Sequence, residues 1–106
     1  MSNVQKDFRK YVNFDLDTKQ LKAVYPGKRY TDAYLDIKRF FKRQGFEQNQ
    51  GSGYISKEAL PETFIYKLVK RMRKELPWVK VCVKRFVHTD VATEFYDDVR
   101  LISSKR

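Results

Sequence analysis

The sequence predicts one α+β domain, in which a four-stranded antiparallel sheet carries two helices on one face. Two segments have apolar stripes at helical spacing, other segments alternate like strands, and their order along the chain suits such a sheet. A length of 106 residues is near the commonest size for a single domain. We therefore expect one domain over residues 1–106, with residues 1–8 as an N-terminal extension and residues 103–106 as a fraying tail.

The first strand is predicted over residues 11–17. Its apolar residues are Val12, Phe14 and Leu16, and their period of two is typical of a half-buried strand. The other face would carry Tyr11, Asn13, Asp15 and Asp17. Residues 18–29 are polar and include Pro26 and Gly27, so a loop is expected after the strand.

The first long helix is predicted to begin after Thr31, a plausible N-cap, and to end at Lys42 and Arg43, just before Gly45. Its apolar residues recur three and four positions apart, which predicts one buried stripe. This stripe consists of Ala33, Tyr34, Ile37, Phe40 and Phe41.

A hairpin and a second helix follow. Residues 46–49 and 52–56 are short strand candidates joined through Gln50 and Gly51. Pro61 suits the first turn of a helix, and Pro77 prevents its continuation. The buried stripe of this helix would be Ile65, Leu68, Val69, Met72 and Leu76. Its opposite face would be basic, either as a solvated surface or as a phosphate contact, with Lys67, Lys70, Arg71, Arg73 and Lys74.

Residues 79–88 alternate again and predict a fourth strand, with a bulge or strand end where the phase slips at residues 84–86. Residues 92–99 suit a short C-terminal helix. The order strand, helix, strand, strand, helix, strand indicates the ferredoxin-like βαββαβ arrangement. One sheet face would then stay uncovered, and because such a face must be polar, bind something or pair with another copy, we look for function there.

The charge of the chain points to an anionic partner. Lys and Arg number 23 against 13 Asp and Glu, a formal net charge of +10, and such an excess attracts polyanions. Nucleic acid is the first candidate, while solubility alone and an anionic membrane surface are the alternatives. No apolar run approaches the roughly 20 residues that span a bilayer, and the first ten residues lack the apolar segment of a signal peptide. A cytoplasmic protein is expected.

Classical catalytic and metal-binding side chains are few. Cys82 is the single cysteine, and its place in an apolar run predicts a small buried residue rather than a nucleophile. His88 is the single histidine. Without a second His or a Cys nearby it is a poor metal ligand, although it could titrate near an RNA phosphate.

The ordered motifs over residues 9–100 resemble the virulence-associated protein D (VapD) family, which is similar in fold to the small nuclease of CRISPR adaptation. The motifs are Phe-Asp-Leu at residues 14–16, Tyr-Thr-Asp-Ala-Tyr at 30–34 with Asp-Ile at 36–37, Gly-Phe at 45–46, Gln-Gly-Ser at 50–52, Tyr54 and Trp78. Departures are the N-terminal extension, Asn13 in the first strand and the basic second helix. These departures affect substrate details more than the fold.

The resemblance implies an endoribonuclease that acts as a homodimer, often the toxin of a toxin and antitoxin pair, with RNA as substrate. Asp15 is the catalytic position carried over, near a groove shared by two copies. Two Asp15 carboxylates brought together could hold Mg²⁺, or the pKa of one of them could be raised by the other. Ser52 is a second catalytic candidate, and Gln50 and Tyr54 would contact RNA together with the five basic helix residues.

Each of these residues could instead have a purely structural role. An Asp at a strand end is often a turn or cap residue, residues 50–52 suit a turn, and Tyr54 could belong to the core. The alternative function is a non-catalytic nucleic-acid-binding dimer, and a further one is a protein-interaction dimer. An RNA-recognition-motif domain shares the element order, but its aromatic third-strand signature is absent here.

Overall fold

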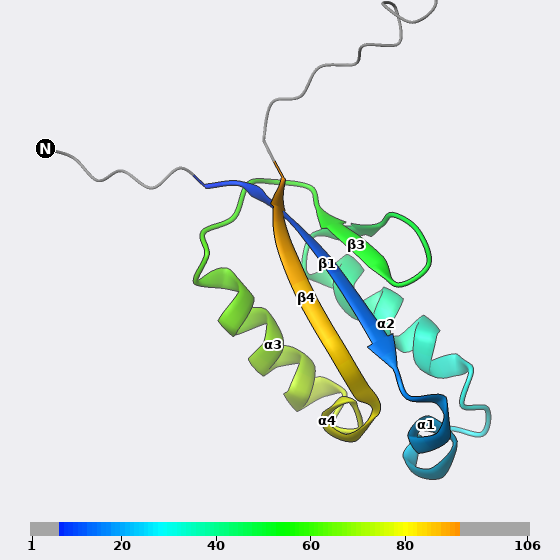
Figure 1. The fold of residues 1–106 in the computed structure, drawn as a ribbon. Coiled ribbons are helices and arrows are strands. Elements are labelled where there is room, and N and C mark those ends of the chain that lie inside the picture. The colour runs from blue at the N-terminus through cyan, green and yellow to red at the C-terminus, as the bar shows by residue number, and fades with distance from the viewer. Residues whose placement is uncertain (1–6, 92–106) are drawn as a thin grey trace, which may run out of the picture.

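Four strands form one antiparallel sheet, and the two long helices lie together on one side of it (Figure 1). The computed structural model describes residues 7–91. The strands are β1 (Arg9–Leu16), β2 (Phe46–Gln48), β3 (Gly53–Ser56) and β4 (Val83–Val91), in the sheet order β2-β3-β1-β4. The helices are α1 (Thr18–Val24), α2 (Asp32–Arg43), α3 (Phe64–Glu75) and α4 (Val79–Cys82). The predicted α+β, ferredoxin-like fold is confirmed.

Strand β1 is central and has the predicted alternation. Val12, Phe14 and Leu16 are at most 9% exposed and face the helices, whereas Asp15 is exposed on the other face. β1 pairs with β3 on one side and with β4 on the other, both antiparallel. The β1–β4 register shifts between Asp15 and Leu16, which pair with Arg85 and Val83, so of the two predicted alternatives at residues 84–86 the structure has the bulge and not the strand end.

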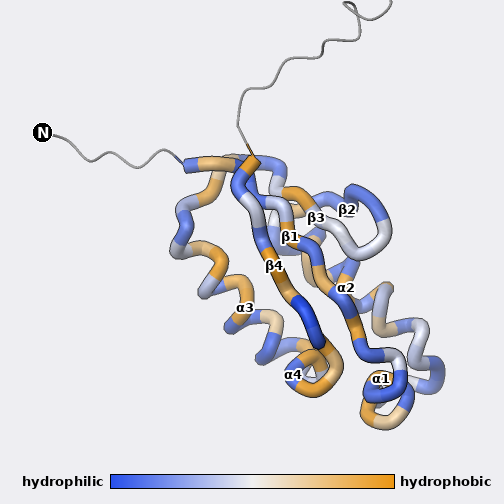
Figure 2. The backbone as a smooth tube through the Cα atoms, in the orientation of Figure 1, coloured by the Kyte–Doolittle hydropathy of each residue, from blue (hydrophilic) through white to orange (hydrophobic). Residues whose placement is uncertain are grey.

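The helices bury most of their predicted stripes. In α2 the residues Ala33, Ile37, Phe40 and Phe41 have no exposed surface. Tyr34 is 43% exposed and does not belong to that stripe. In α3 the buried residues are Ile65, Leu68 and Met72. Figure 2 shows hydrophobic and hydrophilic segments alternating along α3, as expected for a helix with one face against the sheet.

The expected loop over residues 18–29 is wrong for its first half, which forms helix α1. The Asp17 carboxylate Oδ1 accepts a hydrogen bond from the backbone N–H of Gln20 at 3.2 Å and caps the helix. Leu21 is fully buried and anchors it. One cap and one buried leucine are sufficient for two turns here, although the other residues of the helix are exposed.

The fourth strand also begins later than predicted, because residues 79–82 form the helical turn α4. Trp78 O accepts hydrogen bonds from the backbone N–H of Val81 and of Cys82, each at 3.1 Å. Val79 and Cys82 are buried three residues apart, while Val81 is 52% exposed. The alternating valines therefore follow a helical turn and not a strand.

The expected helix over residues 92–99, the tail over 103–106 and residues 1–6 lie outside the described residues. Phe8 forms an isolated antiparallel bridge with Leu60 at the start of β1. Among residues 7–91, no helix is both long and apolar enough to cross a membrane.

Candidate functional site

Asp15 lies on the sheet face that carries no helix in the described chain. It is exposed and pairs across β1 and β4 with Arg85, so both side chains lie on this open face. Tyr11 lies on the same face against Gly53, where an added Cβ would come within 2.1 Å of the Tyr11 hydroxyl oxygen. Because Gly53 has no side chain, the Tyr11 phenol ring can lie directly over β3 at this position. The open face presents a carboxylate, a cation and an aromatic ring.

Asp17 does not belong to this open face, which corrects the sequence expectation. Its carboxylate caps α1, and its backbone N–H donates to Cys82 O at 2.7 Å. Asp17 is therefore a structural residue at the junction of β1 and α1. Asp15 is left as the exposed acidic residue of β1.

The predicted residues Gln50 and Ser52 lie in the turn between β2 and β3. The Gly53 N–H donates to Gln50 O at 2.7 Å, and Gly51 has a φ of +48°, which favours glycine. Because Asn13 pairs with Gly53, this turn lies at the end of the sheet where Asp15 lies. Gln50 is exposed and Ser52 is half-buried. The structure thus brings the turn and Asp15 to one end of the sheet.

Tyr54 belongs to the hydrophobic core, and its assignment to RNA contact is not supported. It is 2% exposed and faces the helices. Its ring stacks on Phe41 with 4.4 Å between centroids and on Phe14 with 6.0 Å. Burial raises the pKa of its hydroxyl. A ring enclosed by two phenylalanines cannot stack on an RNA base.

The basic side chains of α3 are exposed as predicted, but the helix packs against the sheet face opposite Asp15 (Figure 1). Lys67, Lys70, Arg71 and Lys74 recur three and four residues apart, so they share one side of the helix. Arg71 donates to Gln44 Oε1 at 2.8 Å. In one chain, the basic surface and Asp15 are therefore not brought together.

Arg73 has different surroundings from the other basic residues of α3. It lines a pocket of about 440 Å³ between α3, α4 and β4. Lys80 is the second cation at this pocket, and the other lining residues are Val69, Met72, Val79, Val83 and Phe86. Arg73 therefore borders an apolar hollow rather than the basic side of α3.

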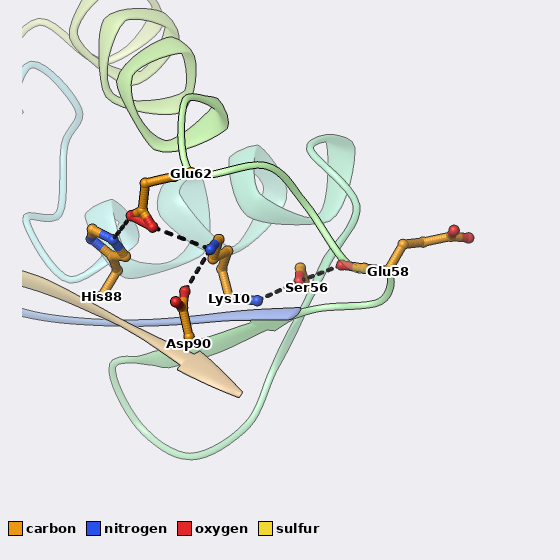
Figure 3. A network of polar contacts seen from close by, with 6 residues as sticks. All are labelled: Lys10, Ser56, Glu58, Glu62, His88 and Asp90. Atoms are coloured by element: carbon orange, nitrogen blue, oxygen red, sulfur yellow. Dashed lines mark hydrogen bonds and ion pairs between the residues drawn. The ribbon is translucent and has the colours of Figure 1, made fainter. Parts of the chain in front are cut away.

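A polar network lies at the end of the sheet away from the β2–β3 turn (Figure 3), and the sequence did not predict it. Lys10 is 2% exposed, and its Nζ lies 2.5 Å from Asp90 Oδ1 and 3.3 Å from Glu62 Oε1. His88 Nε2 lies 2.8 Å from Glu62 Oε2. Ser56 Oγ accepts from the Lys10 backbone N–H at 2.8 Å and donates to Glu58 O at 2.7 Å.

The hydrogen bonds of this network favour the charged forms of Lys10 and Glu62. Burial opposes the charge of Lys10, but hydrogen bonds to Asp90 and Glu62 outweigh it, so its pKa is raised. The hydrogen bond from His88, followed by that from Lys10, lowers the pKa of Glu62. Glu62 is thus held as a carboxylate between two donors.

One signal in the sequence indicates Lys10. It is in phase with Val12 and Phe14, so the period of the strand places a lysine on the helix-facing side, where a charge needs partners. The partners themselves are 52 and 80 residues away in sequence. Their identity follows only from the pairing of β1 with β4 and from the position of the segment before α3.

The remaining candidates are structural. Cys82 is fully buried, and burial followed by the nearby Asp17 raises the pKa of its thiol, which confirms that it is a core residue. Within residues 7–91, no three His, Cys, Asp or Glu side chains gather as a metal site. A single copy therefore offers Asp15 as an isolated carboxylate.

The fold and the basic helix define a small α+β protein of the ferredoxin-like class. The chain is 32% identical over 71 residues to Endoribonuclease VapD 2 of Riemerella anatipestifer, covering 67% of this chain and 76% of the relative. It is 34% identical over 73 residues to the Endoribonuclease VapD homolog of Helicobacter pylori (strain ATCC 700392 / 26695), covering 69% and 75%.

A third relative gives the same result. Endoribonuclease VapD of Dichelobacter nodosus is 37% identical over 73 residues, which cover 69% of this chain and 75% of the relative. No family model matches the chain. The chain belongs to the VapD family, as these three relatives show.

Proposed function

We propose that this chain is an endoribonuclease that cleaves RNA by hydrolase chemistry at phosphodiester bonds. The observation that carries the proposal is the similarity to three relatives named endoribonucleases, each matched over about three quarters of its length. The net charge of +10 and the exposed basic side of α3 support a polyanionic substrate.

Asp15 is proposed as a catalytic residue in a groove shared by two copies of the chain. Its exposure on the open sheet face supports this role. A two-fold axis across that face would bring two Asp15 carboxylates together, and the β2–β3 turn with Gln50 and Ser52 lies at the same end of the sheet. The paired carboxylates would then either bind Mg²⁺ or share a proton.

The family resemblance also suggests a biological role. We propose a cytoplasmic toxin whose activity a protein antitoxin restrains. Induced expression in a bacterial host should slow growth, and the Asp15→Asn variant should slow it less. Equal growth inhibition by both proteins would show that toxicity does not depend on the Asp15 carboxylate.

The second candidate function is an RNA-binding dimer without catalysis. The observation that favours it is the separation of the basic α3 side chains from Asp15 on opposite faces of the sheet. Such a protein would bind RNA through α3 and need no carboxylate.

One experiment separates the two functions. End-labelled single-stranded RNA, duplex RNA and DNA of matched sequence are incubated with the purified protein, with Mg²⁺ or with a chelator. An endoribonuclease shortens RNA and leaves DNA intact, and the chelator shows which cleavage depends on the metal. Retarded but intact RNA in every reaction would establish the binder instead.

A further inference from the structure

His88 and Glu62 form an acid–base pair on the opposite side of the sheet from Asp15. His88 pairs with Val12 across β1 and β4, so it lies on the helix-facing side of the sheet, whereas Asp15 lies on the open face. Val12, the cross-strand partner of His88, precedes Asp15 by three residues in the same strand, or roughly 10 Å at about 3.3 Å per residue. The two groups therefore cannot act on one phosphate within a single chain.

The geometry of the pair suits a base oriented by a carboxylate. Glu62 Oε2 accepts from His88 Nε2 at 2.8 Å, which fixes the hydrogen on Nε2 and leaves Nδ1 to take a proton. The side chains of His88 and Glu62 are 32% and 54% exposed, so a substrate can reach them. Lys10 holds the other oxygen of Glu62 and is itself held by Asp90.

Helix α3, which carries the basic residues, begins close to this pair. α3 begins two residues after Glu62, and Lys67, Lys70, Arg71 and Lys74 follow along one exposed side. RNA bound at the N-terminal end of α3 would therefore lie near Glu62 and His88. The cations of α3 would also offset the negative charges of Glu62 and Asp90 near the phosphates.

We propose that His88, oriented by Glu62, is a catalytic base for RNA cleavage through the 2′-hydroxyl, a proposal that rests on the proposed endoribonuclease function. His88 Nδ1 removes the proton from the 2′-hydroxyl, and O2′ forms a bond to the adjacent phosphorus. The bond from phosphorus to O5′ breaks, and O5′ takes a proton from water. The products carry a 2′,3′-cyclic phosphate and a 5′-hydroxyl, and the imidazolium returns its proton to solvent.

This centre needs no metal ion, so its activity is the cleavage that persists in chelator. Under those conditions the parental protein should give cyclic phosphate ends and should fail at a site where a 2′-deoxynucleotide replaces the ribonucleotide. His88→Ala should cleave about 10² to 10⁴ times more slowly, the usual contribution of a general base. Added imidazole should restore part of the rate, which loss of a structural contact would not allow.

Glu62 is a positioning residue, and its role can be tested separately from that of His88. Glu62→Gln replaces the carboxylate that accepts from His88 Nε2 by an amide of the same size, so kcat in chelator should fall while the KM for RNA stays near the parental value. The charged groups around the pair, Lys10 on β1 and Asp90 on β4, are unchanged in this variant. Glu58→Gln is the matched control, because the Glu58 side chain points away from the network (Figure 3). Its kcat and KM should match those of the parent.

The outcomes separate this inference from the proposed function. Parental cleavage only with Mg²⁺, or chelator-resistant cleavage at the parental rate by folded His88→Ala, would refute the His88 centre and leave the endoribonuclease proposal standing. A His88→Ala protein that melts like the parent but does not respond to imidazole would also refute it. If the parental protein cleaves no RNA under any condition, both proposals are wrong.

Discussion

Glu62 links the stability of the protein to pH through two donors. Its pKa is lowered in the folded chain, chiefly by the hydrogen bond from His88 and then by that from Lys10. A carboxyl group with a lowered folded pKa stabilises the protein above its unfolded pKa and loses this contribution as pH falls through the folded value. The stabilisation is therefore present at neutral pH and lost in acid.

We predict that Glu62→Gln flattens the acid side of the stability profile. Melting temperatures measured between about pH 7 and pH 3 should fall less for Glu62→Gln than for the parent, since the amide does not titrate. Glu58→Gln should follow the parent. Parallel curves for Glu62→Gln and the parent would mean that the Glu62 contacts contribute no pH-dependent stability.

Asp15→Asn is the most informative variant of the open face. It removes one negative charge and keeps the shape of an exposed side chain, so folding should be unaffected. The cleavage that requires Mg²⁺, which is the rate with Mg²⁺ minus the rate with chelator, should be at least about a hundredfold slower, because the amide neither accepts a proton nor replaces a carboxylate ligand. RNA binding should hold or tighten slightly, because a charge that repels phosphates is lost.

Asp17→Asn is the control for that variant. Asparagine also caps helices well, so α1 should persist, and Asp17 is not on the open face. Its cleavage rate in Mg²⁺ should equal that of the parent. Parental activity in Asp15→Asn would exclude a catalytic role for Asp15.

At the scale of elements, α3 should determine how RNA binding depends on salt. Each phosphate contact that is lost removes about one unit from the slope of log affinity against log salt. We predict that reversing Lys70 and Lys74 to glutamate lowers the slope by about two units. Titrations of labelled RNA by fluorescence anisotropy at several salt concentrations measure it.

A control of equal charge separates contact from net charge. Reversal of Lys19 on α1 and Lys38 on α2, both exposed, changes the total charge by the same amount. This variant should keep the parental slope. Equal slopes for the two double variants would place the RNA away from α3.

Long periodic elements could be predicted from the sequence, and short ones could not. β1, α2 and α3 each have several apolar residues in phase, so their buried faces were correct apart from Tyr34. α1 is stabilised by one cap and one buried leucine. Neither produces a periodic pattern in the sequence. Residues 79–82 form α4 although the sequence predicts a strand there, because Val79 and Val81 have the spacing of a strand while Val79 and Cys82 have that of a helical turn.

The candidate site was less predictable than the fold, because contacts distant in sequence decide it. Asp15 could be placed on the open face from the period of its strand. Tyr54 was ambiguous, since its phase depends on where β3 begins, and the structure places it in the core. The contact between His88 and Glu62 joins residues 26 apart and depends on how the segment before α3 meets β4.

For the whole molecule, the open sheet face predicts a two-fold homodimer. Light scattering after size exclusion should give about twice the 12.8 kDa chain mass at micromolar concentration. Val87 is 40% exposed on β4 and pairs with Asn13 on the open face. Val87→Glu should therefore favour the monomer, while Val81→Glu, which alters an exposed valine of α4, should not. If the parental protein is a monomer, the proposal of a groove shared by two copies is wrong.

The central claim, that the chain is an endoribonuclease, is tested most directly with circular single-stranded RNA, which offers no ends to an exonuclease. The parental protein and an Asp15→Asn, His88→Ala double variant, purified in parallel, are each incubated with the circle in Mg²⁺. We predict that the parent first yields linear RNA of unit length and that the double variant does so at least about a hundredfold more slowly. Circles that stay intact with the parent, or that open equally fast with both preparations, would contradict the claim.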